Sequence, residues 1–146
     1  MLVVHDAGEV VVAPGDHREN AALAVENGRV VAVGGTDEVT RDYPPENADR
    51  AIDATGRTVL PGFVDAHTHA LFAGDRSDEF AAKLRGETYQ DILAAGGGIL
   101  RTVRSVRGAS DRALLDGLLD HLDAMLAHGT TTVEVKSGYG LDRGTE

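Results

Sequence analysis

The pattern that most constrains the fold is a strand, a helical stretch and a second strand between residues 63 and 135. Residues 63–69 begin as an apolar strand, expected to be buried, after a Val-Leu-Pro-Gly turn, and residues 130–135 are rich in β-branched side chains. Residues 111–127 between them carry leucines at helical spacing. Parallel strands need a long crossover, which is usually a helix. We therefore expect an α/β fold with a parallel sheet.

The helix expected at residues 111–127 has one broad apolar stripe. Ser110 is suited to cap its N-terminus, and Gly129 follows its end. The stripe consists of Leu114, Leu115, Leu118, Leu119, Leu122, Met125 and Leu126. Such a stripe is a packing surface. We expect residues 130–135, after the helix, to form a buried strand.

Residues 1–58 are expected to form a separate β-rich lobe. Short apolar runs alternate with polar turns, and Asn27-Gly28 is a strong signal for a two-residue hairpin. Residues 36–50 contain two adjacent prolines, which predicts a loop or a short helix that ends before them. The pattern resembles the start of a small β-sandwich. We therefore divide the chain into residues 1–58 and residues 59–146.

Two histidines, His67 and His69, stand where the apolar strand ends. Side chains two positions apart on a strand point to the same face, and Asp65 shares that face. Two imidazoles that converge on one point make half of the ligand set of a catalytic zinc or iron ion. A His-x-His pair also arises by chance at a strand surface. Its place at the carboxyl end of a strand favours a metal site.

Three further motifs have simpler interpretations. Residues 96–98 are all glycine, but they lack the lysine and threonine of a phosphate loop, and no strand immediately precedes them. Arg101, Arg104 and Arg107 recur at helical spacing, which indicates a solvated helix face. Lys136 is a candidate cation or carbamylated metal ligand, although an ordinary loop residue is the simpler interpretation. None of the three motifs predicts a second site.

The composition disfavours several classes of protein. The 24 acidic and 14 basic side chains give a formal charge of −10, which argues against a nucleic-acid partner. Disulfides and thiolate metal sites need cysteine, and the chain has none. No apolar run reaches the roughly 20 residues of a membrane span, so we expect a cytoplasmic protein without a membrane partner. Many aspartates and only two lysines indicate adaptation to high salt.

Several motifs together resemble the imidazolonepropionase family of the amidohydrolase superfamily. They are Asp-Ala-His-Thr-His at 65–69, Phe-Ala-Gly-Asp-Arg at 72–76, Gly-Gly-Gly-Ile at 96–99 and the segment 129–141. Residues 27–34 resemble the N-terminal lobe of that superfamily. The Lys-Ser-Gly-Tyr-Gly-Leu loop at 136–141 is more specific to the family than the histidine pair. The resemblance covers nearly the whole chain.

The resemblance implies a (β/α)8 barrel enzyme that uses one zinc or iron ion. Members of the family hydrolyse the ring C–N amide bond of 4-imidazolone-5-propanoate to N-formimidoyl-L-glutamate in histidine degradation. By motif position, His67 and His69 would be metal ligands. Arg76, Tyr89 and Tyr139 would contact the substrate, with the Arg76 fork on its carboxylate. For the complete chain the resemblance allows a homodimer.

The family's proton-shuttling glutamate and remaining metal ligands would lie beyond Glu146. A barrel of this class typically needs about 250 residues, so we expect the chain to be the N-terminal part of a longer enzyme and inactive alone. The sheet of the isolated chain would have unpaired edges, and its leucine stripe would be uncovered. The alternatives are another cyclic amidohydrolase or deaminase with the same N-terminal architecture, and a catalytically inactive truncated product.

Overall fold

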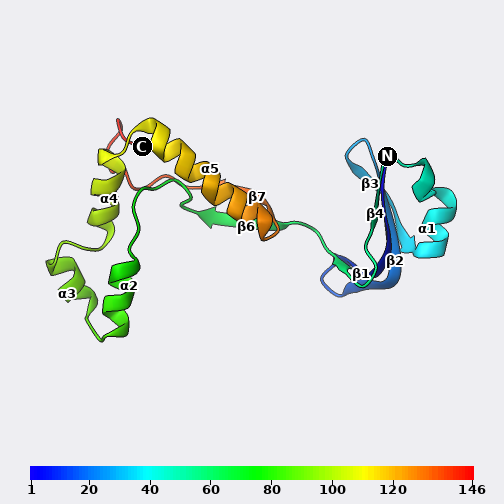
Figure 1. Ribbon diagram of the computed structural model, residues 1–146, viewed down its shortest axis with the longest axis horizontal. Coiled ribbons are helices and arrows are strands. Elements are labelled where there is room, and N and C mark those ends of the chain that lie inside the picture. The colour runs from blue at the N-terminus through cyan, green and yellow to red at the C-terminus, as the bar shows by residue number, and fades with distance from the viewer. The chain divides into compact units, whose positions relative to one another are not determined.

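The computed structural model describes residues 1–146 and divides them into two compact units (Figure 1). Unit 1 comprises Met1–Pro61, and unit 2 comprises Gly62–Glu146. The two units differ in content, because unit 1 is mainly strands and unit 2 is mainly helices. The chain is therefore mixed α/β, as the sequence predicted. No helix has the length and apolar character that a membrane crossing requires.

Unit 1 is one mixed sheet with a short helix. Its elements are β1 (Leu2–Ala13), β2 (Asp16–Glu26), β3 (Arg29–Gly35), α1 (Thr36–Asp42), the 3-10 turn η1 (Pro45–Asn47), β4 (Arg50–Asp53) and β5 (Thr58–Val59). The strand order is β3-β2-β1-β4, and β5 also pairs with β1. The hairpins β1–β2 and β2–β3 are antiparallel, whereas β4 and β5 run parallel to β1. A sandwich needs a second facing sheet, so the sandwich lobe stays a prediction.

Local sequence signals account for most of unit 1. Asn27 and Gly28 have φ of 51° and 74°, and they form the predicted hairpin turn between β2 and β3. The helix alternative for residues 36–50 is confirmed, because α1 ends before the prolines. The apolar runs at residues 2–4 and 10–12, which the sequence predicts as short strands, are not separate, however. They belong to the single strand β1, which continues through an irregularity beside Asp6, a residue with φ of 54°.

Apolar side chains are buried on both faces of the unit 1 sheet. One cluster is formed by Val4, Ala7, Val10, Ala21 and Ala54. The other is formed by Val3, Ala22, Ala24 and Val39. Since neighbouring residues of a strand point to opposite faces, the alternation of Val3 with Val4 divides these clusters between the two faces. Val39 comes from α1, which therefore covers the second face.

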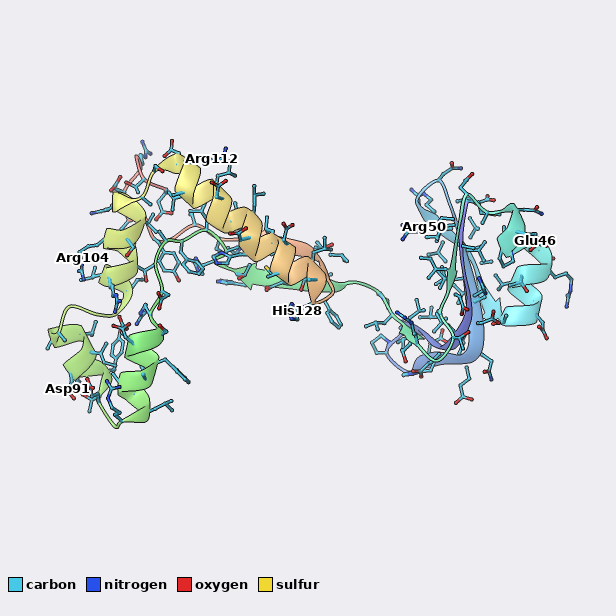
Figure 2. All side chains as sticks on the ribbon, in the orientation of Figure 1. Glu46, Arg50, Asp91, Arg104, Arg112 and His128 are labelled. Carbon is cyan, nitrogen blue, oxygen red and sulfur yellow. The ribbon has the colours of Figure 1, made fainter.

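Unit 2 contains the predicted strand, helical crossover and second strand. Its elements are β6 (Phe63–Thr68), α2 (Ser77–Leu84), α3 (Tyr89–Ala94), α4 (Ile99–Gly108), α5 (Asp111–Ala127) and β7 (Thr130–Val135). Strands β6 and β7 pair in parallel, which confirms the βαβ prediction. Ser110 accepts the Ala113 N–H at 3.2 Å and caps α5. Figure 2 shows Arg112 and His128 at the two ends of that helix.

The predicted burial of strands β6 and β7 is wrong for this chain. Phe63 is 53% exposed and Val64 is 67% exposed, and neither β7 nor α5 has a buried residue. The reason is that β6 and β7 form a sheet of only two strands, so each keeps an unpaired edge. The expected uncovered leucine stripe is confirmed, since Leu115, Leu119 and Leu126 are about half exposed or more.

Candidate metal and substrate site

His67 and His69 come from the carboxyl end of β6, and their side chains lie close together. Their ring centroids are 5.6 Å apart, with an angle of 63° between the planes. The Asp65 carboxylate accepts the backbone N–H of His67 at 3.0 Å, which fixes the backbone where the strand ends. The strand thus presents two imidazole rings as neighbours, the arrangement that one cation needs from two ligands.

His69 lies against the loop that follows β7. The backbone N–H of Lys136 donates to the carbonyl of Thr68 at 2.7 Å, and this bond continues the parallel pairing past the strand ends. The Tyr139 ring is 5.3 Å from the His69 ring. Gly138 has a φ of 146°, and a Cβ there would lie 3.1 Å from Cε1 of His69. Glycine is therefore required for this close approach.

The Nδ1 atom of His69 is buried and has no hydrogen-bond partner. A buried polar atom without a partner is costly, and it usually marks a functional role or a missing ligand. Coordination of a cation by the imidazole would set its tautomer and give the ring nitrogens partners. His67 and His69 therefore fit a metal site in donor type, and the buried Nδ1 atom of His69 adds to this fit, although His67 is exposed. No third histidine or carboxylate of residues 1–146 joins them in a cluster.

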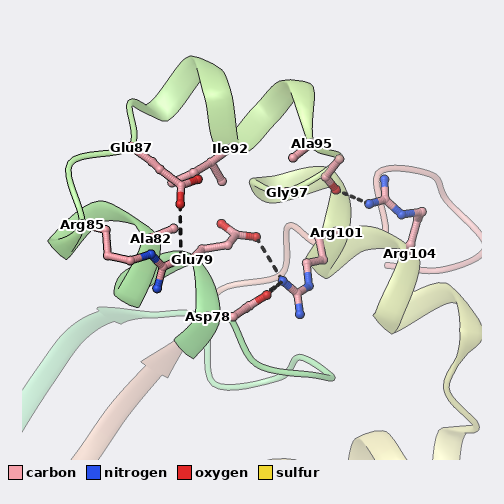
Figure 3. A pocket seen from close by; sticks show the side chains of 11 residues that line it. Asp78, Glu79, Ala82, Arg85, Glu87, Ile92, Ala95, Gly97, Arg101 and Arg104 are labelled. Carbon is pink, nitrogen blue, oxygen red and sulfur yellow. Dashed lines mark hydrogen bonds and ion pairs between the residues drawn. The ribbon is translucent and has the colours of Figure 1, made fainter.

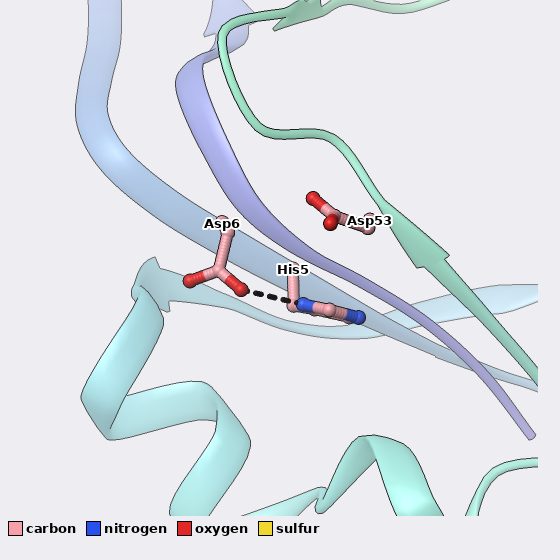
Figure 4. A group of neighbouring side chains, drawn as sticks. All are labelled: His5, Asp6 and Asp53. Atoms are coloured by element: carbon pink, nitrogen blue, oxygen red, sulfur yellow. Dashed lines mark hydrogen bonds and ion pairs between the residues drawn. The ribbon is translucent and has the colours of Figure 1, made fainter.

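The one group of three metal-ligating side chains lies in unit 1 and comprises His5, Asp6 and Asp53 (Figure 4). The Nδ1 atom of His5 donates to Asp6 at 2.7 Å. Asp53 accepts the backbone N–H and the hydroxyl of Thr55, at 2.8 and 2.6 Å. These hydrogen bonds lower the pKa of Asp53. The hydrogen bonds within the group already explain its geometry, so we assign no metal to it.

An aromatic contact anchors the segment after β6 to α5. The ring of Phe72 stacks on His121 with a centroid distance of 4.6 Å, and it meets Tyr139 edge-on at 6.4 Å. Nδ1 of His121 donates to the carbonyl of Ala70 at 2.7 Å. The sequence analysis missed His121, because one histidine on a leucine-rich helix gives no signal of such a partner. This contact holds Tyr139 and residues 70–72 together.

Arg76 is engaged by an internal carboxylate. Its Nε and Nη2 atoms donate to Oε2 of Glu79 at 2.8 and 2.5 Å. Glu79 raises the pKa of Arg76 most strongly, and the phenols of Tyr89 and Tyr139 contribute to the same shift. Tyr89 and Tyr139, the other two predicted substrate residues, thus each act on the charge of Arg76 although the three come from separate segments. The side chain of Arg76 is 37% exposed, and Tyr89 is 52% exposed.

Arg104 and Arg107 are exposed and Arg101 is partly exposed, as a solvated face predicts, but all three arginines also bind neighbouring segments. Arg101 donates to the Asp78 carboxylate at 2.7 and 2.8 Å, and Arg104 donates to the carbonyl of Gly96. Arg107 donates to the carbonyl of Gly140 at 2.9 Å and also reaches the carboxylate of Asp142. Helical spacing indicated a common face correctly. It carried no information on the loops that come to lie against that face.

Residues 96–98 close over the Glu79 carboxylate rather than over a phosphate. The N–H of Gly98 donates to both Glu79 oxygens, at 3.1 and 3.2 Å. A cavity of about 500 Å³ adjoins this contact between α2, α3 and α4 (Figure 3). The carboxylates of Glu87 and Asp78 pair with Arg85 and Arg101 at its wall. Arg85 and Arg101 are thus neutralised, whereas Arg104, which also lines the cavity, donates to the carbonyl of Gly96 and pairs with no carboxylate.

The loop 136–141 is held by a second carboxylate. Glu146 accepts the N–H groups of Gly140 and Leu141 at 3.1 and 2.8 Å. The hydrogen bond from the Leu141 N–H lowers the pKa of Glu146 most, and that from the Ser137 hydroxyl lowers it further. The ammonium of Lys136 pairs with Glu134. The loop that carries Tyr139 is therefore fixed by hydrogen bonds at its backbone.

Comparison with known proteins gives two matches to family models. A family described as the amidohydrolase family matches residues 50–146. A family described as an imidazolonepropionase-like composite domain of bacteria matches residues 21–45. These matches confirm the resemblance inferred from the motifs.

Curated relatives and solved structures agree with these families. Imidazolonepropionases from Haloarcula marismortui and Halobacterium salinarum are each 67% identical over 150 residues, covering 99% of this chain and 36% of the relative. The imidazolonepropionase from Symbiobacterium thermophilum is 51% identical over 156 residues, which cover 99% of this chain and 37% of the relative. The chain thus spans little more than a third of these relatives.

Two solved structures share the fold. A prolidase complexed with N-methylphosphonate-L-proline has a TM-score of 0.58 at 22% identity, covering 90% of this chain and 24% of its own. Ochratoxinase from A. niger has a TM-score of 0.54 at 17% identity, and the match covers 95% of this chain and 26% of the ochratoxinase chain. At this identity the likeness shows the fold alone.

Proposed function

Since the chain belongs to the amidohydrolase family, we propose that the protein carrying it hydrolyses the ring amide bond of 4-imidazolone-5-propanoate to N-formimidoyl-L-glutamate. The identity with imidazolonepropionases, 67% over nearly all of the chain, favours this substrate over those of other cyclic amidohydrolases and of deaminases. The observation that carries the proposal is the buried, unpartnered Nδ1 of His69 at the end of β6, with Tyr139 packed against the same ring.

We infer that His67 and His69 hold one zinc or iron ion. Both are nitrogen donors on one strand end, which fits a catalytic zinc or a non-haem iron. When bound, the ion would supply a Lewis acid that activates water near neutral pH. Two imidazoles make a weak site, so the family's other metal ligands and its proton-shuttling glutamate are expected outside residues 1–146.

The other residues would bind and orient the substrate. Arg76 carries a positive charge at any physiological pH, so it suits the propanoate carboxylate. Tyr139 lies against the His69 ring, and its charge contributes to the raised pKa of Arg76. Its flat ring suits a small planar heterocycle, and Tyr89 offers a second exposed hydroxyl nearby. The cationic end and the histidine end of the site would thus fix the orientation of the imidazolone ring.

The test is turnover by the complete protein. We expect it to consume 4-imidazolone-5-propanoate with release of N-formimidoyl-L-glutamate, to lose activity on chelation, and to regain it with Zn²⁺ or Fe²⁺. His69→Ala should lose activity and bound metal together. His128→Ala is the matched control, because His128 bonds only the carbonyl of Ala124 in its own helix, and it should behave as the wild type.

Other outcomes would overturn the proposal in different ways. Turnover of another cyclic amide, or release of ammonia from an amino-substituted ring, would assign the protein to the alternative class of amidohydrolases or deaminases. A folded complete protein that retains no metal and turns over none of these substrates would be a catalytically inactive product.

A further inference from the structure

Glu79 is the most deeply buried charged side chain of the protein, with 6% of the residue exposed. Its neighbour Asp78 on the same helix is largely exposed. A buried carboxylate is costly unless several donors compensate for its lost hydration. Glu79 has such donors in Arg76 and in the Gly98 N–H, and it also forms an ion pair with Arg101 at 3.7 Å. Two segments, Arg76 at the start of α2 and residues 98–101 at the start of α4, therefore compensate this one carboxylate.

The glycines 96–98 make this burial possible. A Cβ at Gly97 would lie 2.8 Å from Oε1 of Glu79. Gly98 has φ of 74° and ψ of −162°, a backbone conformation that only glycine adopts readily. A Cβ at Gly98 would also stand 3.8 Å from the Tyr89 hydroxyl, so Tyr89 borders the same loop. The loop thus joins Glu79 to a second predicted substrate residue.

Glu79 engages Arg76 from one side only. An arginine side chain has five N–H donors arranged in a planar fork. Nε and Nη2 of Arg76 face Glu79, while Nη1 makes no hydrogen bond within residues 1–146. The edge formed by Nη1 and the second hydrogen of Nη2 is therefore free for another carboxylate. Two donors on one edge match the spacing of two carboxylate oxygens.

We propose that Glu79 is the positioning residue for Arg76. It holds the Nε and Nη2 side of the guanidinium, so that the free edge formed by Nη1 and Nη2 faces the carboxylate of the substrate. This inference rests on the proposed function, because it takes the substrate to carry a carboxylate. Glu79 itself would not touch the substrate. It would order the guanidinium beforehand, so that less conformational entropy is lost when the substrate binds.

The test compares Glu79→Gln with Asp78→Asn in the complete, metal-loaded enzyme. Both changes remove one negative charge from adjacent positions of α2, but only the first loosens Arg76. We expect Glu79→Gln to raise KM by roughly ten- to a hundredfold, the range for a hydrogen bond to a charged group, with a smaller change in kcat. Asp78→Asn should leave KM within about twofold, because exposed ion pairs contribute little.

Two further measurements separate positioning from a general structural role. Glu79→Gln should not weaken binding of a carboxamide analogue of the substrate, and it should add no further loss of affinity in an Arg76→Ala background. Equal losses for the carboxylate and the carboxamide, or additive losses with Arg76→Ala, would overturn the inference. So would equal behaviour of the Glu79 and Asp78 variants. Absence of turnover by the wild type would instead count against the proposed function.

If Glu79→Gln does not fold, a structure of the wild-type enzyme with bound product tests the inference instead. The product carboxylate should lie on the Nη1 edge of Arg76 while Nε still faces Glu79. A guanidinium turned away from Glu79, or a product carboxylate bound by other residues, would contradict the inference.

Discussion

Unit 1 and unit 2 bury their apolar side chains in different ways. In unit 1 the buried residues come from the sheet and its helix, and Val3 is completely inaccessible. In unit 2 the strands and α5 bury nothing fully, and burial falls on the segment after β6 and on α2, α3 and α4. Unit 1 therefore has a core on each face of its sheet, whereas the sheet of unit 2 has none.

The candidate site therefore lies in unit 2, the unit whose sheet has no buried core. His67 belongs to β6 and His69 directly follows it, and the apolar residues Phe63 and Val64 of this strand are more than half exposed. Polar contacts hold the surrounding loops instead, through the carboxylates of Glu79 and Glu146. A catalytic site needs a rigid support, so β6 and β7 need cover from further strands before the histidines can be held firmly.

The largest expected effect is a difference in hydrogen exchange between the two units. In the 146-residue chain, we expect amides of β1 and β2 to exchange roughly a hundredfold more slowly, or slower still, than those of β6 and β7, because a two-stranded sheet opens easily. Exchange measured residue by residue by NMR would test this. Equal protection of β6 and β1 would break the comparison.

The same substitution in each unit should give unequal losses of stability. Val3→Ala removes buried methyl groups and should lower the free energy of unfolding of unit 1 by about 2 kcal/mol. Val64→Ala removes methyl groups that are already exposed, so its effect should stay within about 0.5 kcal/mol. Urea unfolding of both variants measures the difference. In the complete protein, a larger cost for Val64→Ala would show that β6 has gained cover.

Acid should disorder α2 and the loop 96–98 before the sheet of unit 1. The hydrogen bond from Arg76 holds the pKa of Glu79 below its ordinary value of 4.5. A lowered pKa means that the stabilisation is complete above 4.5 and is lost as the pH falls through the lower folded value. NMR of the chain during acid titration should therefore show this region change first.

Variants with one carboxylate removed provide the control for the acid titration. Glu79→Gln should remove this part of the pH dependence in unit 2. Asp53→Asn should leave it in place, since Asp53 lies in the other unit and bonds Thr55 beside it. An unchanged titration of α2 in Glu79→Gln would contradict the expectation.

The smallest expected effect concerns salt. Unit 1 has 11 acidic and 5 basic side chains and a formal charge of −6. Unit 2 has 13 acidic and 9 basic side chains and a formal charge of −4. Mobile ions screen repulsion among exposed charges, so molar KCl should stabilise both units and the smaller, more acidic unit 1 somewhat more. Thermal unfolding at low and molar KCl measures this. A stability that does not rise with salt would contradict the high-salt hypothesis.

Features that depend on a few neighbouring residues were predictable. The Asn27-Gly28 turn, the Ser110 cap and the parallel pairing of β6 with β7 follow from turn chemistry and residue periodicity. The proximity of His67 and His69 follows from their spacing on a strand. The burial of β6 and β7 was mispredicted, because periodicity shows which face is apolar but not what covers it.

The sequence by itself determined the order of the elements, the turns and caps between them, and the meeting of two imidazoles at one strand end. Each of these depends on backbone geometry within a few residues. Only the tertiary structure decided that Glu79 binds both Arg76 and the Gly98 backbone, and that the Nδ1 atom of His69 is buried without a partner. Gly98 lies 19 positions from Glu79. Such contacts depend on which surfaces meet when the helices and loops pack, and local propensity carries no information on that choice.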